Sequence, residues 1–140
     1  LGKHAHQNVI KTVEEIKKVP KDRILVCGGN EPGHSTDFDS ALFAKAIKAD
    51  LLIKATDVDG VYSSDPDENP EAKKFYKLNY KQFKEIISKN KQEPGQYRLF
   101  DLSAIRIIEK SKTKLVIING NDPEEIIRAV EGRDKGTRIM

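Results

Sequence analysis

Three short apolar runs lie between polar segments of the chain. They cover residues 24–27, 51–56 and 115–118 and are rich in Leu, Ile and Val. Apolar runs of this length, bounded by turn residues, are typical of buried strands. A further short strand is predicted over residues 137–139. The pattern therefore predicts a sheet that is largely buried.

Apolar residues recur at helical spacing in the segments between these runs. The period predicts helices over residues 8–19, 38–47, 80–88, 101–108 and 123–131. Asn8 and Asp101 are predicted N-caps, and the second helix is predicted to begin among Ser35, Thr36 and Asp37. In the last helix, Ile126, Ile127 and Val130 are predicted to line the apolar face.

Strands that alternate with helices indicate an α/β fold. The run 24–27, the helix after it and the run 51–56 predict a βαβ unit, which implies parallel strands and a right-handed crossover. We predict one α/β domain over residues 1–140, a three-layer α/β/α arrangement with a mainly parallel sheet. Ligands of such sheets bind beyond the carboxyl ends of the strands, so loops 28–33 and 57–65 are predicted to face the same side.

The glycine-rich loop before residue 38 is a candidate phosphate site. It joins a predicted strand to a capped helix, whose N-terminus offers N–H groups and a partial positive charge. The dinucleotide pattern fails at Asn30, and the P-loop pattern fails because His34 replaces its lysine. A plain strand-to-helix turn is the alternative interpretation.

The loop over residues 56–66 is the second candidate. Val58 and Val61 are predicted to tether it, while Tyr62 and Asp65 project outward. An aromatic ring beside a carboxylate suits a nucleoside, because the ring stacks on the base and the carboxylate accepts hydrogen bonds. The alternatives are an ordinary turn and an Asp-rich calcium loop, and the missing EF-hand ligands argue against calcium.

Composition narrows the classes of partner. The chain has 25 basic and 22 acidic residues, a formal charge of +3, which gives no case for nucleic-acid binding. No run approaches a membrane span, and the single cysteine, Cys27, predicted to pack as a small apolar side chain at a strand end, suits a reducing cytoplasm. His4 and His6 have no third ligand nearby, so no metal cluster is predicted.

Several motifs together resemble the archaeal type of uridine monophosphate kinase, in the amino-acid kinase superfamily. The resemblance runs from residue 23 almost to the end of the chain. The residues that carry it are Gly28-Gly29, Pro32-Gly33-His34-Ser35-Thr36-Asp37, Ala55-Thr56-Asp57-Val58-Asp59-Gly60-Val61-Tyr62, Asp65-Pro66, Phe100-Asp101-Leu102-Ser103-Ala104 and Gly136-Thr137.

This resemblance implies a role for each loop. ATP, with Mg²⁺, would bind through Thr56, Tyr62 and Asp65, and Asp37 would be the catalytic aspartate that orients a lysine and the phosphates. The family commonly forms homo-hexamers. The residues on the UMP side would be Asn30, Glu31, Pro32, Gly33, His34, Ser35 and Thr36.

The sequence departs from the family pattern in two ways. Leu102-Ser103 replaces the usual Pro-Leu at a helix start. The N-terminal half of the family fold, which carries the catalytic lysine, is absent from these residues, so the chain is expected to be a fragment or a half-protein without chemistry. Lys54 is predicted to point at solvent or at an acidic neighbour, with reach to the site as the alternative.

Three functions remain open at this point. The first is a cytoplasmic uridylate kinase that converts ATP and UMP to ADP and UDP. The second is a nucleotide-binding or storage module without catalysis. The third is a kinase of the same superfamily with another acceptor, which the loop 32–34 argues against because it resembles the uridylate type.

Overall fold

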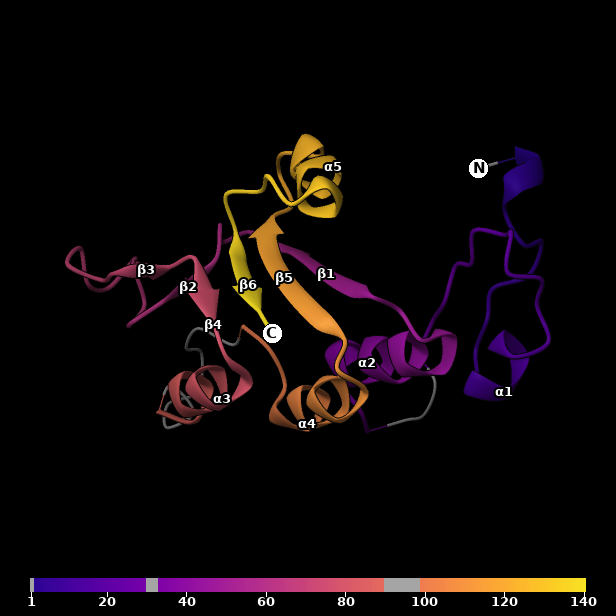
Figure 1. Ribbon diagram of the computed structural model, residues 1–140, viewed down its shortest axis with the longest axis horizontal. Helices are drawn as coiled ribbons and strands as arrows, with labels where there is room; N and C mark the ends of the chain where they lie inside the picture. Colours follow the sequence, from indigo (N-terminus) through magenta and orange to yellow (C-terminus); the bar gives the residue numbers. More distant parts are fainter. Residues whose placement is uncertain (1, 30–32, 90–98) are drawn as a thin grey trace.

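A mixed four-stranded sheet forms the centre of the molecule (Figure 1). The computed structural model describes residues 2–29, 33–89 and 99–140. The strand order is β1-β5-β6-β4, where β1 is Leu51–Thr56, β5 is Lys114–Asn119, β6 is Thr137–Ile139 and β4 is Lys77–Leu78. β1 and β5 are parallel, β6 is antiparallel to β5, and β4 is parallel to β6. The predicted mainly parallel sheet is confirmed.

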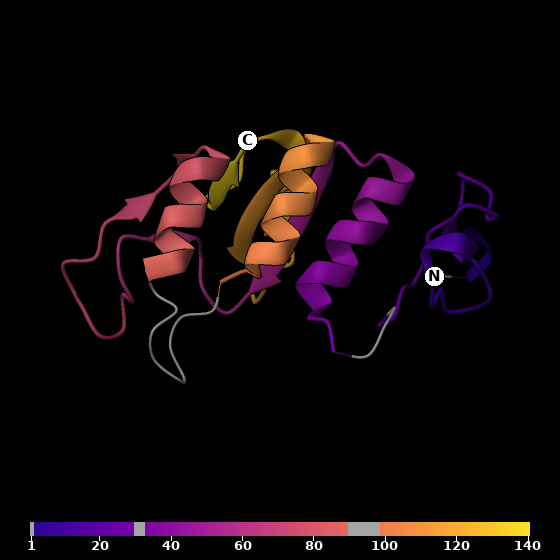
Figure 2. The same ribbon diagram turned by 90° about the horizontal axis from the view of Figure 1, so that it is seen from below.

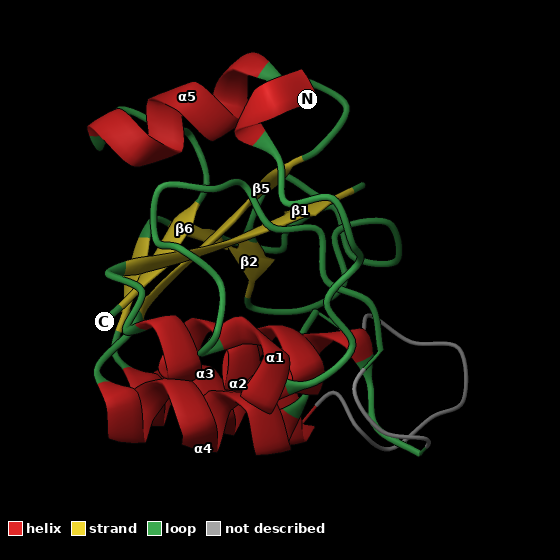
Figure 3. Ribbon diagram, turned by 90° about the vertical axis from the view of Figure 1, so that its right-hand side faces the viewer, coloured by secondary structure: helices red, strands yellow, loops and turns green. Residues whose placement is uncertain are grey.

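Helices cover both faces of this sheet, which confirms the predicted three layers (Figure 3). Helices α2 (Thr36–Ile47), α3 (Tyr80–Lys89) and α4 (Leu102–Ser111) lie on one face, and α5 (Glu124–Glu131) lies on the other. A separate hairpin pairs β2 (Val61–Tyr62) with β3 (Lys74–Phe75). None of the helices in the described parts of the chain has the length and hydrophobicity of a membrane span.

Strand β5 is buried on both sides, because successive side chains point to opposite faces. Leu115 and Ile117 belong to the core under α3 and α4, whereas Val116 and Ile118 pack with Ala129 of α5. All four of these side chains are fully buried. Each such burial stabilises the fold by about 1.5–3 kcal/mol, so β5 holds the layers together.

The predicted strand over residues 24–27 is wrong. Ile24 and Cys27 form only isolated bridges with residues 5 and 10, and neither pairs with β1. Ile24, Val26 and Cys27 are exposed, which also corrects the packing predicted for the cysteine. An apolar run becomes a buried strand only where a sheet and a covering layer receive it, and the described residues supply neither here. The predicted βαβ unit therefore fails at its first strand.

The predicted first helix is much shorter than expected. Only α1 (Val13–Ile16) forms, after a short 3₁₀ turn, η1 (Gly2–His4). Thr12 caps α1 by accepting a hydrogen bond from the N–H of Glu15, so Asn8 is not the cap. Ile10 instead forms an isolated bridge with Cys27, so residues 8–11 are not helical.

Helix α5 presents its predicted apolar face to solvent. Ile126, Ile127 and Val130 are 44%, 61% and 69% exposed, while Glu125 and Ala129 are buried against the sheet. The prediction of this face is wrong, because a charged side chain occupies the buried side. The helix ends as predicted at Gly132, and Pro123 is its N-cap rather than its first residue.

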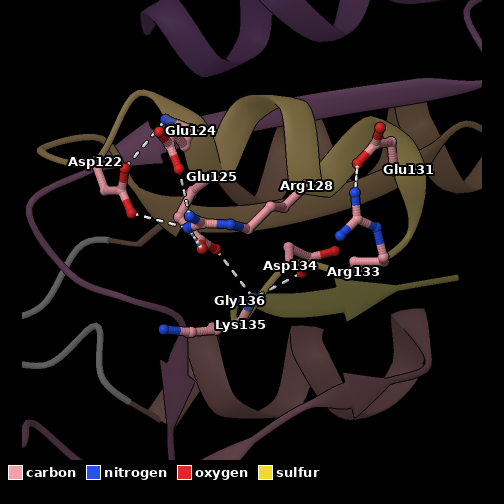
Figure 4. Close-up of polar contacts among 9 residues, drawn as sticks. All are labelled: Asp122, Glu124, Glu125, Arg128, Glu131, Arg133, Asp134, Lys135 and Gly136. Atoms are coloured by element: carbon pink, nitrogen blue, oxygen red, sulfur yellow. Dashed lines mark hydrogen bonds and ion pairs between the residues drawn. The ribbon is translucent and has the colours of Figure 1, made fainter.

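Glu125 is buried because donors surround it (Figure 4). Arg128 donates to Glu125 at 2.6 Å, and the backbone N–H of Lys135 donates to the other carboxylate oxygen at 3.0 Å. These two bonds, the backbone bond first, lower the pKa of Glu125 below its ordinary value. Arg128 also contacts Asp122 and the exposed Glu124. The cluster thus fixes the turn that leads from α5 into β6.

Replacing Glu125 with Gln should destabilise the protein in a pH-dependent way. We expect a loss of about 1–2 kcal/mol at pH 7, because Arg128 and the N–H of Lys135 lose a charged acceptor. The ordinary pKa of Glu125 is 4.5, and its folded value is lower. The stabilisation is therefore complete above pH 4.5 and is lost as the pH falls through the folded value. Urea denaturation from pH 3 to 7 measures the effect.

The matched control is Glu124→Gln, which removes an exposed partner of the same arginine. An exposed ion pair contributes little, so this variant should stay within about 0.5 kcal/mol of wild type. Equal losses in the two variants, or a Glu125→Gln loss that persists at pH 3, would contradict the assignment.

Candidate functional site

The N-termini of α2 and α4 are joined by a hydrogen bond between their cap residues, Ser35 and Asp101. The Ser35 hydroxyl accepts from the N–H of Phe38 at 3.2 Å and donates to Asp101 at 2.9 Å. Asp101 in turn accepts from the N–H of Ser103 at 2.7 Å. Both predicted caps are confirmed, and the two helices lie side by side (Figure 2). Their positive N-terminal ends therefore lie together.

A pocket of about 270 Å³ opens between α2, β1 and the start of α4. It combines residues of the first two turns of α2 with β1, and Phe100 closes one side. The lining residues are Thr36, Asp37, Ser40, Leu52, Ile53, Lys54, Ala55 and Phe100. The described part of the pocket thus brings together polar groups at a helix N-terminus and apolar groups of a strand.

An ion pair joins α2 to β1 inside this pocket. The Lys54 ammonium donates to Asp37 at 2.6 Å, and the side chains are 23% and 16% exposed. The same ammonium lies 5.6 Å from the centre of the Phe100 ring, within the range of a cation–π interaction. Lys54 therefore does point at an acidic neighbour, as predicted. It is also a cation in the pocket, which the sequence offered only as the alternative.

The residues predicted for the UMP side lead into α2. Thr36 lines the pocket, and Ser35 caps the helix. The exposed His34 ring stacks on Phe38, with ring centroids 4.2 Å apart and planes 15° from parallel. Gly33 precedes it, while Asn30, Glu31 and Pro32 lie outside the described residues.

Of the residues predicted for the ATP side, Thr56 ends β1, Tyr62 belongs to β2 and Asp65 follows β2, and none of them lines the pocket. The hydroxyl of Thr56 donates to Asp57 at 2.9 Å. Tyr62 donates to Asp59 at 2.8 Å, and Asp65 accepts from the N–H of Asp67 at 2.9 Å. The structure therefore brings Thr36, Asp37 and Lys54 together but leaves Tyr62 and Asp65 in a separate part of the site.

A charged network orders the second loop. Lys74 of β3 donates to Asp59 at 2.7 Å, opposite the hydrogen bond from Tyr62. Burial alone would raise the pKa of Asp59, but the bonds from Lys74 and Tyr62 lower the pKa below its ordinary value. Burial and the Asp59 carboxylate raise the pKa of Tyr62 to about 12, so its hydroxyl stays protonated and committed to Asp59. The predicted tether is confirmed, since Val61 is fully buried and Val58 packs on the core.

The sequence missed several residues of this region. Ser40 lies one helical turn after Asp37, so helical spacing alone would have placed it on the same face. Phe100 belongs to a family motif in the sequence but gave no signal for the pocket, and Lys74 gave none, because each meets its partner only through tertiary pairing. Among the described residues no group of three or more His, Cys, Asp or Glu side chains is arranged to hold a metal ion.

A double-mutant cycle on Ser35→Ala and Asp101→Asn should reveal the link between the caps. The Ser35→Ala variant loses both bonds, whereas the Asp101→Asn variant keeps an acceptor for Ser103 but no longer offers Ser35 a charged acceptor. We expect Ser35→Ala to cost about 1 kcal/mol and the coupling energy to be about 0.5–1.5 kcal/mol. Urea denaturation of the four proteins measures it. A coupling below about 0.3 kcal/mol would mean that the helices are joined by packing alone.

Comparison with known proteins identifies the fold. A sequence model of the amino acid kinase family matches residues 2–119. The uridylate kinase of Archaeoglobus fulgidus is 45% identical over 134 residues, which are 88% of this chain and 61% of that protein. The uridylate kinase of Methanobrevibacter smithii is 39% identical over 141 residues, which are 100% of this chain and 63% of that protein.

Solved structures agree with these sequence matches. The crystal structure of the Archaeoglobus fulgidus uridylate kinase has a TM-score of 0.85 and 42% identity, covering 99% of this chain and 62% of that one. The UMP kinase of Bacillus anthracis has a TM-score of 0.73 and 27% identity, covering 91% and 50%. The chain thus spans 61% to 63% of the length of these archaeal relatives. With the family model matched over most of its residues and the same fold in its relatives, this chain belongs to the amino acid kinase family.

Proposed function

We propose that this protein is a uridylate kinase, which transfers the γ-phosphoryl group of ATP to UMP and releases ADP and UDP. The observation that carries the proposal is the Asp37–Lys54 ion pair, which lies in a pocket at the N-terminus of α2. Archaeal relatives named uridylate kinase, 37% to 45% identical, support the choice of acceptor. So do the residues around His34, which resemble the UMP loop of that family.

In the proposed reaction, the negative charge of the transferred phosphoryl group lies beside positive groups of the pocket. A phosphate oxygen of UMP attacks the γ-phosphorus, a new P–O bond forms, and the bond to the β-phosphate oxygen breaks so that its electrons leave with ADP. Such transfer depends on positioning and on neutralising charge rather than on covalent chemistry by the protein. Lys54 and the N-terminus of α2 supply positive charge, and Asp37 holds the ammonium in place.

The two nucleotides are assigned to the two loops. UMP is assigned to residues 30–36, of which Thr36 lines the pocket. ATP is assigned to Thr56, Tyr62 and Asp65, where the hydroxyl of Tyr62 is held by Asp59 and its ring is left to stack. The described residues form no cluster of metal ligands of their own. Mg²⁺ would therefore enter the site bound to the nucleotide phosphates. Mg²⁺ neutralises phosphate charge in such sites, and Asp37 is the carboxylate in the pocket suited to orient it.

We assign the rest of the active site to the region of the related uridylate kinases that this chain does not cover. The family resemblance puts a second, phosphoryl-contacting lysine there, so these 140 residues alone should not reach the family's activity. A homo-hexamer and a cytoplasmic location are part of the same proposal. Light scattering of the full-length gene product tests the assembly.

The proposal is tested by comparing Lys54→Met with wild type in the full-length gene product. We expect kcat with UMP to fall by about 10²–10³, the usual cost of removing one preorganised charge donor. Lys84→Met is the control, because Lys84 also pairs with a carboxylate, that of Glu109, but in a more exposed ion pair away from the pocket. Its kcat should be unchanged.

Wild type should phosphorylate UMP and leave acetylglutamate and isopentenyl phosphate unreacted. Turnover of one of those two compounds in preference to UMP would identify another kinase of the family. Nucleotide binding without turnover of any acceptor would indicate a storage or binding module instead.

Asp65→Ala should weaken ATP binding far more than UMP binding. The expected loss for ATP is about ten- to a hundredfold in affinity, because a charged acceptor for a ligand hydroxyl is removed. Asp67→Ala is the control, since Asp67 lies two residues along the same loop and is exposed. Calorimetry with each nucleotide measures both affinities, and equal losses for ATP and UMP would refute the assignment of the loop.

A further inference from the structure

Thr137 of β6 reaches across to the β2–β3 hairpin. Its hydroxyl accepts from the N–H of Val61 at 2.8 Å and donates to the carbonyl of Phe75. Val61 and Phe75 face each other in the hairpin, so one side chain holds both strands at the same rung. Thr137 is fully buried, which makes these bonds hard to replace by water.

Two glycines let the backbones come close enough for this contact. A Cβ on Gly60 would lie 2.6 Å from the Thr137 hydroxyl oxygen, and the φ of Gly60 is +154°. A Cβ on Gly136 would lie 2.1 Å from the carbonyl oxygen of Ile117. Side chains at either position would force β6 away from the hairpin or from β5.

The position of Thr137 is itself fixed from the other side of the sheet. Glu125 of α5 accepts from the N–H of Lys135, two residues before Thr137 (Figure 4). Thr137 also pairs with Ile117 in the antiparallel register of β5 and β6. The hydroxyl is therefore presented to the hairpin by a rigid element rather than by a loop.

We propose that Thr137 is the positioning residue for the loop over residues 56–66, to which ATP is assigned; this inference rests on the proposed function. Its hydroxyl holds Val61, the neighbour of Tyr62, and thereby sets where the Tyr62 ring and Asp65 meet the nucleotide. Asp59 and Lys74 order the loop internally, whereas the Thr137 hydroxyl bonds both strands of the Val61–Phe75 rung to β6 of the main sheet. Thr137 is not among the lining residues of the pocket between α2 and β1.

Thr137→Val tests this inference, with Thr137→Ser as the conservative rescue. Valine keeps the shape but removes both hydrogen bonds, whereas serine keeps the hydroxyl. In the full-length gene product, assayed well below the melting temperature, we expect Thr137→Val to raise the KM for ATP about tenfold. The KM for UMP should stay within about twofold, and Thr137→Ser should restore the KM for ATP.

Thr113→Val controls for general destabilisation. Thr113, which directly precedes β5, is another buried threonine, and its hydroxyl hydrogen-bonds with that of Ser111 at the end of α4. The Thr113→Val variant should lower the melting temperature without changing the KM for ATP or the KM for UMP. If Thr137→Val does not fold, Gly60→Ala disturbs the same contact from the loop side and should raise the KM for ATP selectively.

Three results would overturn the inference alone: parallel changes in both KM values, an unchanged KM for ATP, or a serine variant that behaves like valine. Absence of UMP-dependent turnover in wild type would instead overturn the proposed function and, with it, this inference. The two failures are therefore distinguishable in one experiment.

Discussion

The ion pair between Asp37 and Lys54 is the interaction on which the candidate site depends. It places a carboxylate of α2 against an ammonium of β1 in a partly buried pocket, where the attraction is stronger than in water. Burial of both groups has a desolvation cost, which is offset only while α2 and β1 keep their relative position. The bond from Ser35 to Asp101 and the packing of α2 beside α4 maintain that position.

Regular local signals explain what could be predicted from the sequence. β1, β5 and β6, with α2, α3 and α4, follow from apolar runs, helical periodicity and caps such as Ser35 and Asp101. The failures are long-range in origin. Residues 24–27 are apolar enough for a strand, yet the described residues contain no sheet to receive them. The buried side of α5 is set by Glu125. Its ion pair with Arg128 is local on the helix, but its hydrogen bond from the N–H of Lys135, ten residues further along the chain, depends on the turn into β6.

The residues of the candidate site also fall into those that local sequence patterns predict and those that depend on long-range contacts. Thr36 and Asp37 belong to one loop-helix junction, so the sequence predicted them and the structure places both at the pocket. The sequence places Lys54 in a predicted strand, but only its contact with Asp37 makes it a cation of the pocket. Phe100 and Thr137 act through partners that are 46 or more residues away in the chain. A contact between residues so far apart in the chain has no local sequence pattern, whereas a buried strand or a capped helix does have one.

The central claim is that the transferred phosphoryl group is bound in the pocket beside Lys54. The most direct measurement is a crystal structure of the full-length gene product with UMP and a non-hydrolysable ATP analogue. The account predicts a terminal phosphate oxygen of the bound nucleotides within about 3 Å of the Lys54 ammonium nitrogen, at the N-terminus of α2. Phosphates bound elsewhere, with Lys54 still held only by Asp37 and solvent, would contradict it.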